Sequence, residues 1–172
     1  MAATNPRQSK TQPTPQKVTT FLWFNDNAEE AVKFYCSVFK NSRILNITPK
    51  PESVPGPNVN VLTVDFELDG QRFAALNGGP QFKFTEAISL VVSCDTQEEI
   101  DYFWEKLSEG GGQQVECGWV KDKYGLSWQV VPSNLTTEIL TGDKQQVDRV
   151  MKAVMQMKKL DIAELEKAAR GE

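Results

Sequence analysis

Hydrophobic and polar residues change their spacing several times along the chain, and each spacing predicts a kind of element. Residues 17–24 are rich in β-branched and aromatic side chains, which is typical of a strand. A capping-box pair, Asn27 and Glu30, then predicts the start of a helix. The apolar residues of that helix recur at helical spacing: Ala31, Phe34, Tyr35 and Val38. A strand at 42–49 and a proline-rich loop ending at Pro57 follow.

Strict alternation marks residues 59–68 and predicts a strand with two unlike faces. The apolar face holds Leu62, Val64, Phe66 and Leu68, and the polar face holds Thr63, Asp65 and Glu67. Asp69 and Gly70 supply a two-residue turn, which predicts a hairpin. The expected cross-strand pairs are Glu67 with Arg72, Phe66 with Phe73 and Asp65 with Ala74.

The same unit of one strand, one helix and three strands occurs a second time. A strand at 87–94 precedes a helix that opens with another capping-box pair, Thr96 and Glu99, and a later hairpin has Gly125 where the first has Gly70. One such unit is too small to close a core alone. We therefore predict an α+β fold of tandem βαβββ modules, with helices on the outer faces and a curved mixed sheet around a cleft.

The expected domain organisation follows this repeat. A disordered tail spans 1–16, the paired modules span 17–132 (about 17–80 and 86–132), and a helical extension spans 133–172. A transit peptide is the alternative reading of the tail. In the extension, capping residues Asp143 and Asp161 begin two helices with apolar stripes. Each stripe packs on its own domain or clasps a second copy.

Composition and charge exclude several partners and sites. The net charge of −4 leaves no cationic stripe for nucleic acid, and no apolar run approaches a membrane span or a secretory signal. Three cysteines without CxxC spacing fit reduced thiols and a cytoplasmic protein. Cys117 is either a catalytic thiol or a small buried hydrophobe. The chain contains no histidine, which excludes catalytic triads and metal sites that need one.

Three segments resemble a known family: "NAEEAVKFYCSVFKNS" from Asn27, "ALNGGPQFKFTEAIS" from Ala75 and "CGWVKDKYGLSWQVVP" from Cys117. They are similar to the PhnB-like branch of the vicinal oxygen chelate superfamily, which includes glyoxalases, extradiol dioxygenases and antibiotic-binding resistance proteins. The resemblance runs from about Val18 into the C-terminal "MKKLDIAELEKA". Such proteins often carry the name demethylubiquinone methyltransferase. The glycine cluster at 110–112 does not support that activity, because it follows a helix rather than a strand.

The resemblance also implies where a metal would bind. Metal-dependent members carry His or Glu ligands at four cavity-facing positions, which fall here on Thr19, Ala74, Ile88 and Gln129. Of these four only Gln129 keeps any ligand character, and a neutral amide is a poor substitute for a carboxylate. The resemblance therefore implies a fold of the glyoxalase and bleomycin resistance type without a metal or another cofactor.

The expected cleft is largely apolar, as small-molecule pockets tend to be. Its lining residues are Thr19, Phe21, Trp23, Leu90, Val92 and Gln129. Gln129 either orients a ligand or is satisfied by a neighbouring polar group or water. Trp119 either stacks on a ligand or pairs with Trp128 across the hairpin.

Three further polar residues are candidates for the site. Asp65 is a candidate general base, with a solvated rim carboxylate paired to Arg72 as the alternative. Arg72 is itself expected at the ligand. Asn77 either hydrogen-bonds a substrate or serves a turn.

These residues predict a homodimer that binds a small organic molecule in a metal-free cleft. The alternative is a metal-independent isomerase or lyase, with Asp65 as base and Gln129 or Asn77 steadying an oxyanion. An inert dimeric scaffold is a third option. The sequence leaves open whether the protein is an enzyme.

Overall fold

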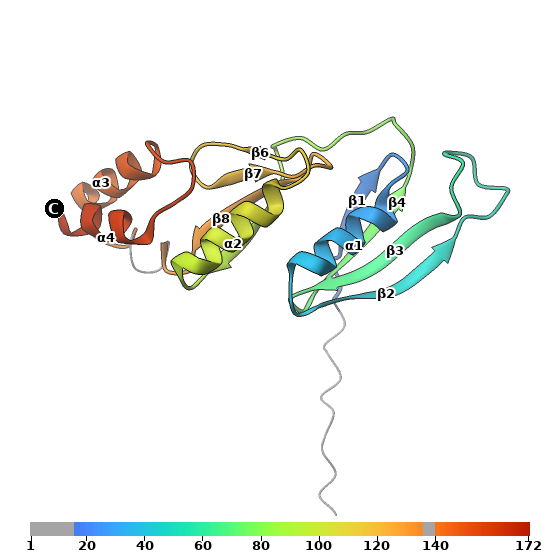
Figure 1. Cartoon of the computed structure of the whole chain (residues 1–172), viewed down its shortest axis with the longest axis horizontal. Coiled ribbons are helices and arrows are strands. Elements are labelled where there is room, and N and C mark those ends of the chain that lie inside the picture. The colour runs from blue at the N-terminus through green and yellow to red at the C-terminus, as the bar shows by residue number, and fades with distance from the viewer. Residues whose placement is uncertain (1–15, 136–139) are drawn as a thin grey trace, which may run out of the picture.

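The computed structural model describes residues 16–135 and 140–172, so the predicted disordered tail lies outside the described residues except for Gln16. Two modules and a pair of C-terminal helices lie in a row along the long axis of the molecule (Figure 1). No helix within the described ranges is long and apolar enough to cross a membrane.

The first module contains one helix and four strands. Its elements are β1 (Thr20–Phe24), α1 (Ala28–Val38), β2 (Ser42–Pro49), β3 (Val61–Leu68) and β4 (Gln71–Asn77). The sheet order is β1-β4-β3-β2, with β1 parallel to β4 and the other pairs antiparallel. The predicted hairpin register is confirmed, because Asp65 lies opposite Ala74 and Glu67 opposite Arg72.

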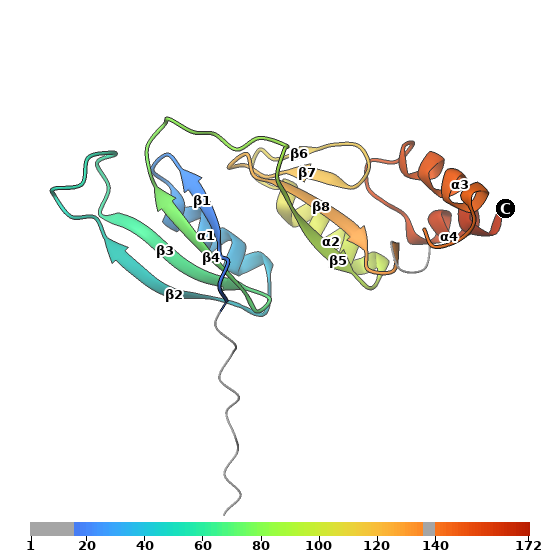
Figure 2. The same ribbon diagram turned by 180° about the vertical axis from the view of Figure 1, so that it is seen from behind.

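The second module repeats this topology. Its elements are β5 (Ser89–Cys94), α2 (Gln97–Ser108), β6 (Gln113–Gln114), β7 (Trp119–Lys121) and β8 (Ser127–Pro132), in the sheet order β5-β8-β7-β6. The predicted duplication is therefore confirmed. Both helices cover the same side of the molecule, and the view from behind shows the strands of both sheets uncovered (Figure 2). Within one chain the two open faces thus lie side by side.

The two module helices receive their N-terminal hydrogen bonds in different ways. In α2, the Thr96 side chain accepts from the Glu99 amide, as predicted. In α1, Asn27 makes no side-chain cap, so the predicted capping role of its side chain is wrong. The Asn77 side chain, from the end of β4, accepts instead from the Ala28 amide at 2.8 Å. The sheet itself therefore supplies the cap of α1.

A buried carboxylate joins the modules. Asp122, 3% exposed, precedes the turn between β7 and β8, and its Oδ2 accepts hydrogen bonds from the Tyr35 hydroxyl and the Trp128 indole at 2.8 Å each. Its Oδ1 accepts from the amides of Tyr124 and Leu126. Both oxygens are satisfied, as a buried carboxylate requires. Tyr35 brings α1 to this centre, so the carboxylate holds the first module to the second.

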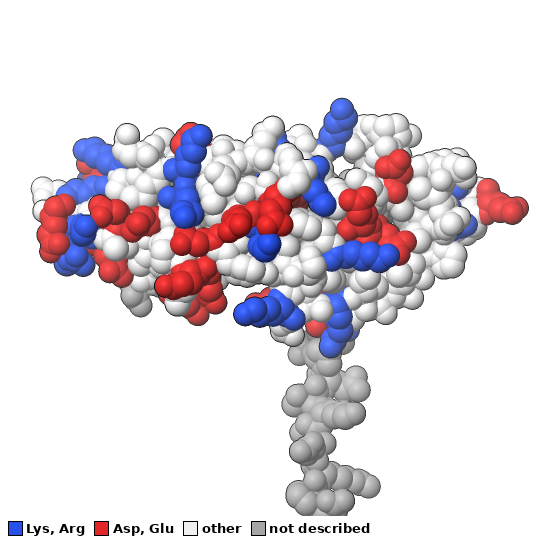
Figure 3. All heavy atoms as spheres, in the orientation of Figure 1, with Lys and Arg blue, Asp and Glu red and all other residues white. Residues whose placement is uncertain are grey.

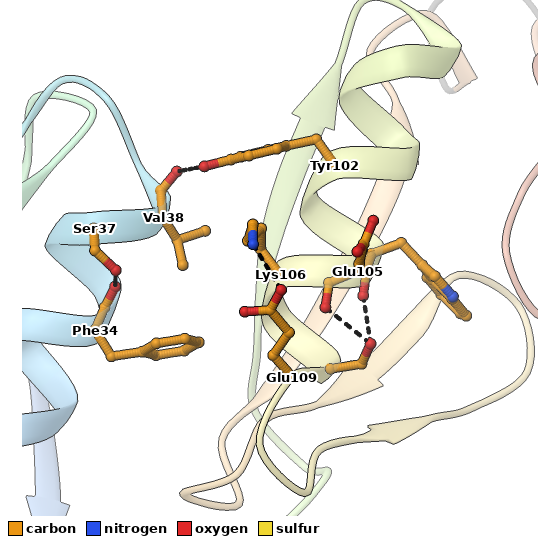
Figure 4. Close-up of polar contacts among 9 residues, drawn as sticks. Phe34, Ser37, Val38, Tyr102, Glu105, Lys106 and Glu109 are labelled. Carbon is orange, nitrogen blue, oxygen red and sulfur yellow. Dashed lines mark hydrogen bonds and ion pairs between the residues drawn. The ribbon is translucent and has the colours of Figure 1, made fainter.

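A second bridge links the helices. The Tyr102 hydroxyl of α2 donates to the Val38 carbonyl at the end of α1 at 2.9 Å, and Figure 4 shows this contact across the gap between the two ribbons. Next to it, the Phe39 ring stacks on Phe103 and Trp128 with centroids 5.1 and 5.4 Å apart. Aromatic burial and hydrogen bonds together fix how the modules sit.

The C-terminal helices, α3 (Lys144–Val154) and α4 (Ile162–Arg170), pack on the second module of their own chain. The Cys117 and Gly118 amides donate to the carbonyls of Met157 and Lys158 at 2.8 and 2.7 Å. The extension's small core consists of Val150, Val154, Leu160 and Leu165. Of the two expected arrangements, the structure therefore has packing in cis.

Candidate functional site

A groove between the modules has a volume of about 750 Å³. This lies within the range of roughly 300–1,000 Å³ that is typical of ligand pockets. We call it the inter-module groove. One wall comes from the end of α1 and the β3–β4 hairpin, and the other from β5 and the start of α2. Its apolar lining residues include Phe39, Phe73, Leu90, Val92, Phe103 and Trp128.

The rim of this groove is acidic. Asp69, Asp95, Glu98 and Glu99 border it, whereas Lys40 is the cation among its lining residues. Figure 3 shows acidic side chains gathered over the middle of the helix-bearing face, where α2 lies. An anion entering the groove would meet a repulsive potential, so neutral or cationic ligands suit it better.

The open face of the first sheet carries most of the predicted cleft residues from the N-terminal half. Phe21 pairs with Ala74 across β1 and β4 and is 58% exposed, and Thr19 precedes β1. The Trp23 indole donates to the Gly79 carbonyl and meets Phe82 edge to face. A Cβ on Gly78 would lie 2.3 Å from the Trp23 ring, so this position requires glycine. Thr19, Phe21 and Trp23 thus lie at an open surface, and their contact with a ligand stays a prediction.

The predicted register of β5 is wrong by one residue. Leu90 pairs with Trp128 and Val92 with Val130, which places both on the helix-covered face. Val91 pairs with Gln129 on the open face instead. A one-residue slip moves every side chain of a strand to the other face. Leu90 and Val92 line the inter-module groove, which Val91 also borders, and they do not share a strand face with Gln129.

Gln129 is satisfied by a neighbour. Its Nε2 donates to the Ser89 hydroxyl at 2.8 Å, which matches one of the two roles expected for it. Trp119 lies directly opposite Gln129, and Trp128 lies opposite Val120, so the expected pairing of the two tryptophans does not occur. Trp119 instead borders a smaller pocket of about 220 Å³ with Lys121 and Ser127.

The remaining predicted polar residues fall in separate places. Asn77 is 3% exposed, with its oxygen bound to the Ala28 amide and its nitrogen donating to the Val61 carbonyl. Both ends of its amide are thus occupied within the protein. Asp65 lies on the open face of β3 opposite Ala74. Arg72 is exposed and lies opposite Glu67, outside the lining of the groove.

Sequence reasoning missed Asp122. Burial raises the pKa of its carboxyl above the usual range, and the hydrogen bonds from Trp128 and Tyr35 oppose that rise. Burial, with the nearby Asp122 charge, also holds the pKa of Tyr35 well above its ordinary value. The signal in the sequence was an acid just before the second hairpin turn.

The residues at the four expected metal positions do not fit a metal ion. A hydroxyl, a methyl, a branched alkyl and an amide stand there, on Thr19, Ala74, Ile88 and Gln129. The amide nitrogen of Gln129 already donates to Ser89. Within the part of the chain that the structure describes, no group of three or more His, Cys, Asp or Glu residues could hold a metal.

Comparisons with known proteins agree with this fold. The family model described as 3-demethylubiquinone-9 3-methyltransferase matches residues 16–131. A PhnB protein from Bacillus cereus is 40% identical with a TM-score of 0.62, covering 68% of this chain and 99% of that one. A search of curated proteins found no significant match.

More distant structures share the fold alone. Protein PA1353 from Pseudomonas aeruginosa is 18% identical with a TM-score of 0.55, covering 67% of this chain and 96% of that one. The fosfomycin resistance protein FosX from Mesorhizobium loti is 12% identical with a TM-score of 0.51, covering 72% and 96%.

The family match stops at residue 131, so the C-terminal helices, which the resemblance was expected to include, lie beyond it. The matched region contains both βαβββ modules. With two thirds of the chain matched and a PhnB protein 40% identical, the chain belongs to the PhnB-like 3-demethylubiquinone-9 3-methyltransferase family, whose fold is that of the glyoxalase and fosfomycin resistance proteins.

Proposed function

We propose that this protein binds a small organic molecule, without a bound transition metal, in the inter-module groove. The observation that carries the proposal is the groove itself, which has a ligand-sized volume, apolar walls from both modules and a polar rim. Such binding does not require a metal centre. Apolar burial supplies the affinity, and the rim groups orient the ligand.

The groove offers no arrangement suited to nucleophilic catalysis. The chain has no histidine, and none of the described lining residues is a cysteine. Asp65 lies on the open sheet face, away from these lining residues. Binding is therefore the function that the groove supports, ahead of an isomerase or lyase that uses Asp65.

The proposal also includes a homodimer. Phe21 and Val91 are each 58% exposed on the open faces of their sheets. These faces lie on the same side of the molecule (Figure 2). A second copy laid against them would bury both residues and would turn the open sheet surface into an enclosed one. The predicted residues Thr19, Phe21, Trp23 and Gln129 would then line an interface.

Native mass spectrometry of gently purified protein, compared with its denatured mass, tests the proposal. The expected result is a dimer with an organic adduct and no metal. Two variants locate the adduct: Leu90→Trp fills the groove and should abolish it, whereas Phe21→Ala alters the open face and should retain it. The reverse pattern would move the ligand to the open face, and a bound divalent metal would overturn the metal-free site.

Asp65→Asn tests the alternative enzyme with the ligand so identified. Asp65→Asn and the wild type are expected to bind the ligand with equal affinity, and neither is expected to convert it. Loss of turnover with retained affinity would instead establish Asp65 as a general base.

A further inference from the structure

Sulfur atoms gather where the C-terminal helices meet the second module. The chain has four methionines, and three of them, Met151, Met155 and Met157, lie within one short segment at the end of α3. The Cys117 Sγ lies 3.7 Å from the Met155 Sδ. Met151 lies one helical turn before Met155, and the Met155 amide donates to the Met151 carbonyl. Residues four apart share one face of a helix, so Met151 and Met155 project from the same face of this segment.

The structure around Cys117 holds its thiol in this place. Its φ of 60° is in the left-handed region, which non-glycine residues adopt at a cost in strain. The Cys117 amide donates to the Met157 carbonyl at 2.8 Å, and the next amide, of Gly118, donates to Lys158. The backbone of one sulfur residue is therefore tied to the segment that carries the others.

These side chains remain reachable from solvent. Met151 is 41% exposed and Met155 is 63% exposed, and the thiol of Cys117 is partly exposed. A thioether left in water contributes little to packing, so the stability of the extension does not account for two exposed methionines next to a thiol.

We propose that Cys117, Met155 and Met151 form a binding site for a soft monovalent metal ion, Cu(I). Thiolate and thioether ligands select Cu(I), whereas hard cations take oxygen ligands. Zinc sites are built from cysteine, histidine and carboxylate groups, and this chain lacks histidine altogether. The site is separate from the inter-module groove, none of whose lining residues it uses.

The geometry suits a shared ion. If each metal–sulfur bond is about as long as a zinc–thiolate bond, about 2.3 Å, sulfurs 3.7 Å apart subtend an angle of about 107° at the metal. This angle lies close to the tetrahedral value. As Cu(I) binds, the Cys117 thiol releases its proton to solvent and a metal–thiolate bond forms. The ion stays monovalent, so no oxidant or reductant takes part.

Anaerobic titration of the full chain with Cu(I), in competition with a colorimetric Cu(I) chelator, tests the site. One Cu(I) should bind per chain, and excess Zn(II) should leave it bound. Cys117→Ser should weaken binding by at least about 100-fold and Met155→Leu by at least about 10-fold, since even changes outside the ligand shell of a metal cost about 10- to 100-fold. Met151→Leu should have a smaller effect than either.

Two matched controls separate this site from general sulfur chemistry. Cys36→Ser removes a partly exposed thiol elsewhere, and Met157→Leu removes a neighbouring thioether that packs on the extension's core. Both should bind Cu(I) like the wild type. Circular dichroism checks that each variant is folded. Unchanged binding in Cys117→Ser and Met155→Leu, or failure of the wild type to take Cu(I) from the chelator, would overturn the proposal.

Discussion

The two modules share a topology but differ in the acid beside their central hairpin turn. Each ends its central hairpin turn in a glycine with positive φ, 80° at Gly70 and 88° at Gly125. The acid in the first turn, Asp69, is exposed, whereas Asp122 in the second is 3% exposed and binds groups from both modules. The acid beside the second hairpin turn thus joins the two modules, whereas the acid in the first turn is a surface residue.

The largest contrast between the modules should come from these two acids. Asp122→Ala leaves the Tyr35 hydroxyl and the Trp128 indole buried without an acceptor, and it should lower the free energy of unfolding by about 3 kcal/mol. Asp69→Asn keeps a side chain that tolerates the positive φ of 44° at this position and alters only a 3.3 Å surface contact with Asn41. It should change the free energy of unfolding by less than about 0.5 kcal/mol. Urea denaturation measures both. Equal losses would show that the junction has no special role.

The helix starts provide the next contrast. Asn77→Ala removes two buried hydrogen bonds and the cap of α1, and it should cost about 2 kcal/mol of unfolding free energy. Thr96→Ala removes a local cap of α2 and should cost about 1 kcal/mol. Asn27→Ala, at a position without a side-chain cap, serves as the control. A loss at Asn27 as large as that at Asn77 would contradict this assignment.

The buried acid also predicts a dependence of stability on pH. Because burial raises the folded-state pKa of Asp122 above its usual 3.8, the folded protein binds more protons than the unfolded chain between these two values. Its contribution to stability is therefore complete below 3.8 and is lost as the pH rises through the raised pKa. The change is at most about 1.4 kcal/mol for each pH unit. Subtracting the stability–pH curve of Asp122→Asn from that of the wild type isolates the contribution of Asp122. Parallel curves would refute this prediction.

The smallest contrast concerns the strand position that holds Ala74 in the first module and Gln129 in the second. Gln129→Ala makes the second module resemble the first and removes the hydrogen bond to Ser89. The expected loss is about 1 kcal/mol or less, since the amide is only partly buried. Thermal unfolding with and without the identified ligand checks this. A fall in the ligand affinity of this variant would show that Gln129 belongs to the binding site.

Periodicity predicted the elements, the duplication and the first hairpin, because alternation between Leu62 and Leu68 and the tight turn at Gly70 leave one register. It failed in β5, where Leu90, Val91 and Val92 are consecutive apolar residues and no polar face marks the open side. A run of this kind carries no information about which face each residue takes. The prediction therefore placed Leu90 on the open face, whereas in the structure Leu90 lines the groove.

The roles of Asn77 and Asp122 depend on distant partners. Asn77 precedes two glycines and reads locally as a turn residue, yet its oxygen binds an amide 49 positions earlier. Asp122 reads as the start of a turn, yet its oxygen binds a tyrosine 87 positions earlier. Local spacing cannot specify partners at such separations, which only the packed modules bring together. The same holds for the surface that receives α3 and α4.

The cap of α1 by Asn77 sets an order for events on the ribosome. Synthesis proceeds at about 5–20 residues per second, and domains fold mainly in that order. The helix emerges well before the strand that carries its cap, so α1 lacks this bond until β4 has left the exit tunnel. The Tyr35 hydroxyl gains its hydrogen-bond acceptor later still, when Asp122 has been synthesised. The nascent first module therefore passes through a stage in which its helix has no side-chain cap at its N-terminus.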